Sequence, residues 1–389
     1  MCLSLANEGV EEIFVSRANA HEASVVEGVR VYGVNDVKDL VDHLNGRINL
    51  APTVFDRQAY ITGKANAGRL DYADVKGQER AKRALEIAAA GNHNLLMIGA
   101  PGTGKSMLAK RLPSILPEMT FEESVETTKI HSVSGILPGD TFLVTTRPYR
   151  SPHHTMSAVA LSGGGSIPMP GEVSLAHNGV LFLDELPEFD KKVTDTLRQP
   201  LEDKRITVTR AMGRPTFPCS FMLVCAMNPC KCGYYGHPTQ PCSCKESDIK
   251  KYMSRISGPL LDRIDIQIEV QSLSYDEISS SQRAESSEAI RERVNKARAF
   301  AIERFEADKL SIHSNGEMEA PEVRKYCVLE DSAKMLLRSA FDNMGLSARG
   351  HDRILRVART IADLDSSETI KARHIAEAIQ LRSLDRKYW

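Results

Sequence analysis

Short apolar runs separated by helix-like segments mark the middle of the chain. Three runs are apolar at every position, at Leu95–Ile98, Val180–Leu183 and Phe221–Ala226. Continuous apolar runs of this length are typical of strands that are buried on both faces, as in parallel sheets covered by helices. The sequence therefore predicts an α/β core domain with a mostly parallel sheet over residues 72–270.

The flanking segments have other patterns. Residues 1–51 alternate short helices with strands at Ile13–Val15 and Val29–Tyr32, and this pattern begins in the middle of an α/β arrangement. We therefore expect a partial N-terminal α/β domain that either lacks earlier sequence or docks on the next domain. The remaining divisions are a linker over 52–71, a helical linker over 271–320 whose long helix is capped at Ser286, and a C-terminal helical lid over 321–389.

A glycine-rich loop follows the first apolar run and precedes a helical pattern. Residues 99–106 match G-x-x-x-x-G-K-[ST], the phosphate-binding loop of many nucleotide-binding proteins. In such a loop backbone N–H groups turn toward the phosphates, Lys105 reaches the β- and γ-phosphates, and the Ser106 hydroxyl ligates Mg²⁺. The predicted nucleotide-binding residues of the loop are Gly99, Ala100, Pro101, Gly102, Thr103, Gly104, Lys105 and Ser106. ATP and Mg²⁺ are thus the expected cofactors.

Polar side chains follow the other two apolar runs. Asp184 and Glu185 end the second run, and Asn228 comes shortly after the third. Phosphoryl transfer needs charge neutralisation and an in-line water more than covalent help. Asp184 would therefore hold Mg²⁺, Glu185 would position the attacking water, and Asn228 would orient the same water. Together with Lys105, these side chains form the predicted hydrolytic site.

The composition of the chain argues against several classes of protein. The 389 residues include 50 basic and 51 acidic side chains, so no global basic field implies nucleic acid, and any DNA contact must be local. No stretch approaches the length of a membrane span, and the first residues lack the basic start of a signal peptide. We expect a cytoplasmic protein with no membrane partner.

Five further motifs accompany the phosphate loop. They are Val75–Gln78, Arg147–His154, Pro170–Val180, Asp184–Phe189 and Ser257–Asp265. In this order they resemble the AAA+ ATPases, and within them the ComM/YifB group of magnesium-chelatase-like proteins. The resemblance implies an AAA+ P-loop NTPase fold with a helical lid. Residues 5–19 resemble the end of a Lon/S5-like domain, whose serine–lysine dyad lies upstream of this stretch, so we do not expect proteolysis by this chain.

The resemblance also assigns roles around the nucleotide. Gly77 and Gln78 would lie near the adenine, and Asn228 would be the sensor 1 residue. Arg349 lies where a lid helix begins, at the position of sensor 2, and would contact the γ-phosphate. Arg353 lies one turn further along the helix and could take the same role, so the sequence leaves both arginines as candidates.

Arg263 resembles the arginine finger of the family. Such a residue stabilises transition-state charge on the ATP of a neighbouring subunit, so it implies a homo-oligomeric ring, expected to be hexameric. The alternative is an ordinary ion pair at a helix end, with Asp262 or Asp265 as the partner.

Two segments could contact a substrate within such a ring. Residues 204–217 are expected to form a β-hairpin that carries Arg205, Arg210 and Arg214. The resemblance implies that this hairpin projects into the pore, where cationic side chains suit single-stranded or branched DNA; the alternative is a solvated hairpin packed on its own subunit. The insert over 141–176 resembles a second pore-side segment. Its adjacent His153 and His154 have no third metal ligand at close spacing, which favours a structural or hydrogen-bonding role.

Six of the eight cysteines crowd between Cys219 and Cys244. Four of them form two C-x-C pairs around a Gly/Pro-rich turn, at Cys230, Cys232, Cys242 and Cys244. Four thiolates at such spacing can surround Zn²⁺ tetrahedrally, which would be a structural site. The alternatives are a reduced thiol cluster, or His237 as a substitute ligand. Cys219 and Cys225 lie on strand patterns and are expected in the core.

Several functions are compatible with these features. The first is a ring-forming DNA motor, a branch-migration helicase of the ComM type that acts in recombination or natural transformation. The second is a magnesium-chelatase-like ATPase subunit that remodels a protein partner. The C-x-C pairs and the N-terminal segment favour the first. An adaptor that only binds ATP is disfavoured by the complete set of hydrolytic residues.

Overall fold

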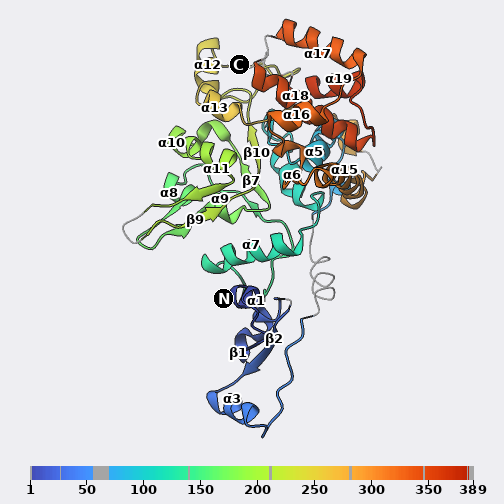
Figure 1. The fold of residues 1–389 in the computed structure, drawn as a ribbon. Helices are drawn as coiled ribbons and strands as arrows, with labels where there is room; N and C mark the ends of the chain where they lie inside the picture. Colours follow the sequence, from blue (N-terminus) through green and yellow to red (C-terminus); the bar gives the residue numbers. More distant parts are fainter. Residues whose placement is uncertain are drawn as a thin grey trace. The chain divides into compact units, whose positions relative to one another are not determined.

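The chain divides into two compact units, which are described separately (Figure 1). The smaller unit comprises residues 1–69 and 119–146, and the larger comprises 70–118 and 147–389. The computed structural model describes residues 2–26, 28–55, 70–138, 141–209, 213–279, 283–344, 347–382 and 384. Most of the predicted linker over 52–71, the side chain of Arg210 and the last five residues of the predicted lid lie outside the described residues.

The smaller unit contains two parallel strands, β1 (Glu12–Ser16) and β2 (Arg30–Val34). These strands confirm the predictions for this segment, with slightly shifted ends. The rings of Phe14 and Tyr32 stack across the pair, with centroids 5.1 Å apart. The helices of this unit are α1 (Cys2–Asn7), α2 (Ala20–Ala23), α3 (Val37–Leu44) and α7 (Phe121–Val133). No pattern in the sequence indicated that α7 groups with the first residues of the chain.

The larger unit is built on a five-stranded parallel sheet in the order β11-β3-β10-β7-β4. Its strands are β3 (Leu95–Ile98), β4 (Tyr149–Arg150), β7 (Val180–Leu183), β10 (Met222–Met227) and β11 (Ile266–Glu269). Every residue of β3, β7 and β10 is buried, as their continuous apolar sequences predicted. The predicted parallel sheet is therefore confirmed.

Short helices and two small antiparallel pairs connect the strands. The helices are α5 (Glu79–Gly91), α6 (Lys105–Arg111), α8 (Ala158–Ser162), α9 (Glu172–Leu175), α10 (Lys191–Asp195), α11 (Arg198–Asp203), α12 (Glu246–Met253), α13 (Gly258–Leu261) and α14 (Tyr275–Ser279). The pairs are β5 (Gly163–Gly164) with β6 (Met169–Pro170), and β8 (Arg205–Thr207) with β9 (Thr216–Pro218). The second pair confirms the strands of the hairpin predicted over 204–217.

Helices also form the C-terminal part of this unit, in orange and red in Figure 1. They are α15 (Ser287–Ala307), α16 (Ala320–Tyr326), α17 (Asp331–Met344), α18 (Ala348–Leu364) and α19 (Ala372–Gln380). Ser286 caps α15 by accepting a hydrogen bond from Ala289 N, as predicted. Helices α15 and α18 both pack on α5, so the helical part shares one apolar core with the sheet. No helix among the described residues is long and apolar enough to cross a membrane.

A buried carboxylate holds the start of β11. Asp265 is 6% exposed, and its oxygens lie 3.5 Å from Arg356 Nη2 and 3.6 Å from His93 Nδ1. Burial alone would raise the pKa of Asp265, but Arg356, the His93 contact and Arg353 outweigh burial and lower that pKa below its ordinary value. The Asp265 charge thus connects α18 and the loop before β3 to the start of β11.

The carboxyl end of β3 also meets its neighbours closely. Gly99 N donates to Met227 O at 3.2 Å, and Val270 N donates to Ile98 O at 2.7 Å. A Cβ atom at Gly99 would overlap the Val270 carbonyl oxygen. Only glycine therefore fits at this position without displacement of the backbone after β11.

We expect Asp265→Asn to lower the free energy of unfolding by about 3 kcal/mol at pH 7, because the half-buried Arg356 loses a buried counter-charge. The folded-state pKa of Asp265 is depressed, so its stabilisation is present above the unfolded pKa of about 3.9 and is lost as the pH falls further. Urea denaturation at pH 7 and at acid pH measures both effects. Asp331→Asn is the control, since the Asp331 side chain is 93% exposed. Equal losses in the two variants would contradict the role of Asp265.

We expect Gly99→Ala to lower the free energy of unfolding by about 1–3 kcal/mol, because the added methyl group collides with the backbone. Gly258→Ala is the matched control, since a Cβ at Gly258 would meet nothing within 4 Å. Urea denaturation of both variants compares them directly. If Gly99→Ala were as stable as the control, the backbone at Val270 would move aside at little cost, which would contradict the predicted collision.

Candidate active site

The predicted hydrolytic residues follow three adjacent strands, at the edge of the sheet where these strands end. The phosphate loop follows β3, Asp184 follows β7 and Asn228 follows β10, and carboxyl ends of parallel strands share an edge. Lys105 Nζ lies 3.3 Å from Asn228 Oδ1, and the Ser106 hydroxyl donates to Asp184 Oδ2 at 2.5 Å. The structure therefore brings together groups that are 78 and 123 residues apart in the sequence.

Lys105 is almost completely buried within its own loop. Its ammonium group donates to the carbonyl oxygens of Gly99 and Ala100, at 2.7 and 2.8 Å. Burial lowers the pKa of Lys105, and the charges of Asp184 and Glu185 oppose this shift. The ammonium group of Lys105 thus lies between the loop carbonyls and the charges of the two carboxylates.

Ser106 and Asp184 fit the donor set of a hard divalent cation. Hydroxyl and carboxylate oxygens are ligands that Mg²⁺ prefers, usually with waters and phosphate oxygens completing the octahedron. Burial, followed by the nearby Asp184 charge, raises the pKa of Tyr149 on β4, so this phenol remains neutral beside the carboxylate. The local negative charge is therefore concentrated on Asp184 and Glu185.

Glu185 has an unusual backbone and an unexpected partner. Its φ of 54° and ψ of 45° place it in the left-handed region, which is strained for a residue with a side chain and is common at functional sites. Its Oε2 lies 3.3 Å from His154 Nδ1, and the His154 ring packs on that of His153 with centroids 4.2 Å apart. From the sequence, we expected only a structural or hydrogen-bonding role for these two histidines. No pattern of neighbouring residues in the sequence indicates the contact of His154 with Glu185.

Gly77 and Gln78 lie on the other side of the phosphate loop. Both have positive φ, and Gln78 Nε2 donates to Thr103 O at 3.1 Å and to Gln271 O at 2.8 Å. Gln78 thus connects the phosphate loop to the segment after β11. Their predicted proximity to an adenine ring remains a prediction.

Arg263 lies at the opposite edge of the sheet. Asn94, which precedes β3, donates from Nδ2 to Arg263 O at 2.8 Å. The four residues of β3 span about 13 Å and separate this edge from the phosphate loop. The Arg263 guanidinium binds Glu202 and the Pro259 carbonyl. Glu202 on α11 is thus its acidic partner among the described residues, instead of Asp262 or Asp265.

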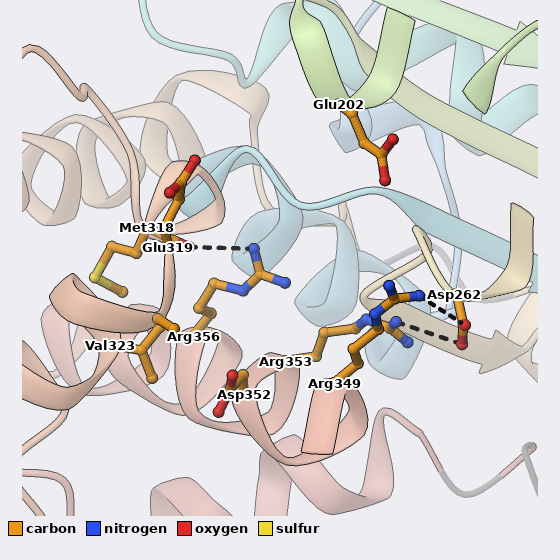
Figure 2. Close-up of a pocket in the computed structure, with 10 residues that line it drawn as sticks. Glu202, Asp262, Met318, Glu319, Val323, Arg349, Asp352, Arg353 and Arg356 are labelled. Atoms are coloured by element: carbon orange, nitrogen blue, oxygen red, sulfur yellow. Dashed lines mark hydrogen bonds and ion pairs between the residues drawn. The ribbon is translucent and has the colours of Figure 1, made fainter. Parts of the chain in front are cut away.

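The two sensor 2 candidates also lie at this second edge (Figure 2). Arg349 and Arg353 both pair with Asp262, at 3.6 and 3.5 Å. Arg356 projects into the same cavity and donates to backbone carbonyls at 3.0 and 3.4 Å. The Arg353 side chain is 4% exposed and that of Arg349 is 73% exposed. The cavity has a volume of about 380 Å³ and is lined by Glu202, Asp262, Met318, Glu319, Ala320, Val323, Arg349, Asp352, Arg353 and Arg356.

The four clustered cysteines come together immediately after Asn228. Their sulfur atoms all lie within 4.8 Å of one another. Cys219 and Cys225 are completely buried in the core, as predicted. His237 instead shares a hydrogen bond with Ser272 and does not belong to the cluster found among the described residues.

The predicted substrate hairpin presents two described arginines to solvent. Arg205 and Arg214 are exposed, whereas Ile206 and Val208 are buried beneath them. The hairpin is therefore amphipathic, with its apolar side chains anchored in the larger unit. Arg210 lies outside the described residues.

The comparisons with known proteins agree with this geometry. Residues 71–278 match the family described as magnesium chelatase, subunit ChlI, and residues 284–382 match its C-terminal part. The chain is 44% identical to Competence protein ComM of Haemophilus influenzae, over 98% of this chain and 73% of that protein. It is 39% identical to Uncharacterized protein YifB of Escherichia coli, over 99% and 74%. It is 25% identical to the Magnesium-chelatase 38 kDa subunit of Rhodobacter capsulatus, over 78% and 84%. The chain therefore belongs to the ComM/YifB family of magnesium-chelatase-like AAA+ proteins.

Proposed function

We propose that this chain is one subunit of a ring-forming ATPase that hydrolyses ATP between neighbouring copies and moves along DNA. One observation carries the intersubunit site: the phosphate loop and the arginine-lined cavity lie at opposite edges of one sheet. When the arginines of one copy contact the phosphate loop of the next, each copy uses two different surfaces, one at each edge of its sheet. Such head-to-tail contacts generate a ring when the rotation between successive copies closes the assembly. A hexamer is the expected closed form.

The residues at the first edge have distinct roles in this proposal. Lys105 binds the β- and γ-phosphates, and Ser106 with Asp184 holds Mg²⁺, which would neutralise phosphate charge. Glu185 positions the attacking water, and Asn228 orients it. Lys105 must leave the loop carbonyls to do so, which is a rotation of its flexible side chain and no change of fold.

The arginines at the second edge act on the neighbouring copy. Arg263 is the finger, and Arg353 or Arg349 adds a second positive charge from the lid. Burial lowers the pKa of Arg353, and the positive charge of Arg382 adds to this shift, so an additional anion would stabilise Arg353. An incoming γ-phosphate has the required charge. Asp262 then acts as the group that aligns Arg349 and Arg353 before contact.

DNA is the substrate that the exposed hairpin favours. Arg205 and Arg214 lie on the solvent side of β8–β9, and cationic loops of a ring pore bind phosphate backbones without reading bases. One relative is named a competence protein, which favours a role in natural transformation or recombination. A protein partner, as in a chelatase subunit, is the alternative outcome of the experiment below.

We expect the purified chain, with ATP and Mg²⁺, to bind branched DNA and displace a strand from it. Lys105→Ala should abolish displacement, because the lysine supplies the phosphate contact. The double variant Arg205→Gln, Arg214→Gln should keep ATP hydrolysis without DNA and lose most DNA binding, with a weaker dependence on salt. Lys334→Gln, at an exposed site, is the control. ATP hydrolysis without any binding of branched or single-stranded DNA would overturn the motor and favour a protein substrate.

We expect Arg263→Ala alone to lower the ATPase rate about 10³-fold or more. An equal mixture of Arg263→Ala and Lys105→Ala chains should recover activity at about a quarter of its sites, where an intact phosphate loop meets an intact arginine on the next copy. The control mixture combines Lys105→Ala with Glu185→Gln, two residues at the same edge of one chain, and should recover nothing. Equal rates in the two mixtures would place Arg263 at the site of its own chain.

A further inference from the structure

The four clustered cysteines adjoin the predicted nucleotide site. Cys230 comes two residues after Asn228 and is completely buried. Gly233, in the turn after Cys230, packs so closely on Pro101 of the phosphate loop that an added Cβ would lie 2.5 Å from its ring. His237 shares a 3.2 Å hydrogen bond with Ser272, which follows β11. The segment 230–238 is thus attached to the phosphate loop on one side and to the segment after β11 on the other.

This segment also forms part of a cavity. The cavity has a volume of about 520 Å³ and begins at the first residues of the phosphate loop. One side is formed by the loop and the segment after β11, and the other by the cysteine segment. Its lining residues are Gly99, Ala100, Pro229, Gly233, Tyr235, Gly236, His237, Pro238, Glu269, Val270, Gln271 and Ser272. The position of the cysteine segment therefore sets the width of a space beside the predicted phosphate site.

The sulfur geometry fits a tetrahedral metal. The Sγ atoms of Cys230, Cys232 and Cys242 lie 3.3, 3.5 and 3.6 Å apart, and all four sulfurs lie within 4.8 Å of one another. Four sulfurs at 2.3 Å from Zn²⁺ would be about 3.8 Å apart. A disulfide joins two sulfurs at about 2.05 Å and gives no reason for four to gather.

The backbone around the cluster supports the same conclusion. Cys244 N donates a hydrogen bond to Cys242 Sγ at 3.4 Å. Such N–H contacts orient thiolate ligands and are typical of the shell around a metal site. Turns at Gly233 and Gly236, both with positive φ, bring the two C-x-C pairs together.

We propose that the four cysteines bind one Zn²⁺. This ion fixes the wall that the cysteine segment forms in the cavity beside the phosphate loop, so that metal occupancy controls nucleotide affinity. The role in affinity rests on the proposed ATP site, whereas the metal site stands on the sulfur geometry alone. The ion is structural, because four protein ligands leave no open position for chemistry. Loss of the metal would free the turn at Gly233 from Pro101 and widen the cavity.

Two measurements separate the metal from its effect. Elemental analysis of the chain, purified without chelator, should give about one zinc per chain, as one four-thiolate site requires. After exchange, Co²⁺ should show the intense visible bands of a tetrahedral site and sulfur-to-cobalt charge transfer. Cys244→Ser should lose both signals, and Cys2→Ser, outside the cluster, should keep them. Iron in place of zinc, or no metal in the wild-type chain, would overturn the site.

Affinity for a fluorescent ATP analogue tests the coupling. We expect Cys244→Ser, or the wild-type chain treated with a chelator, to bind the analogue about tenfold more weakly, in the usual range for coupled sites. Added Zn²⁺ should restore the chelated wild type but leave Cys244→Ser weak, a pattern that simple misfolding would not give. Unchanged affinity after complete loss of zinc would overturn the coupling. A zinc-loaded wild type that binds no nucleotide would instead overturn the proposed ATP site and leave the metal site intact.

Discussion

One asparagine holds the start of three strands in register. Asn94 O accepts hydrogen bonds from Asp265 N and Ile266 N at 3.0 and 3.1 Å, which positions β11. Its Oδ1 accepts from Leu223 N at 2.8 Å, which positions β10, while its Nδ2 binds Arg263 O. Parallel strands have no tight turn to fix their pairing, so a side chain that bonds to both neighbours supplies what a hairpin loop supplies in antiparallel sheets.

This register decides which residues can act on the same phosphate. The five strands of this sheet all run in one direction, so residues that follow a strand and residues that precede one lie at opposite edges, separated by the length of a strand. Lys105 and Asp184 belong to the first set, and Arg263 belongs to the second, at Asn94. Asp265 extends the second set by binding Arg356 of α18, and this contact brings the lid arginines to the same edge. A lid attached there directs its arginines away from the phosphate loop of its own chain.

The sequence predicted those features that depend on neighbouring residues. Apolar runs identified the buried strands, the glycine pattern identified the phosphate loop, and the spacing of four cysteines indicated that they could meet. Each signal lies within about 15 residues, where chain geometry restricts what the side chains can reach. The adjacency of Asp184 and Asn228 followed from the parallel sheet, since the carboxyl ends of parallel strands share one edge.

The sequence could not predict contacts that depend on how distant elements pack. Arg349 and Arg353 looked equivalent because they are one helical turn apart, and only the packing of α18 shows that Arg353 is buried and Arg349 exposed. The contact between His154 and Glu185 joins one residue that precedes β7 in the sequence and one that follows it, with no periodic pattern to indicate it. The grouping of residues 119–146 with the first strands is likewise a long-range contact, in which the rings of His21 and Phe142 lie 5.5 Å apart.

The contact of His154 with Glu185 has a mechanical consequence under the proposed function. Arg150, at the end of β4, binds Glu172 of α9 through two hydrogen bonds of 2.7 Å, so the segment that carries His154 is fixed at its start. Glu185 has a strained left-handed backbone, which limits the alternative positions of its carboxylate. A shift of the segment after β4 would therefore act on the water-positioning group through His154, without displacing Lys105 or Asp184. Under the proposed function, His154 would thus connect substrate contact at this segment to the rate of hydrolysis through its contact with Glu185.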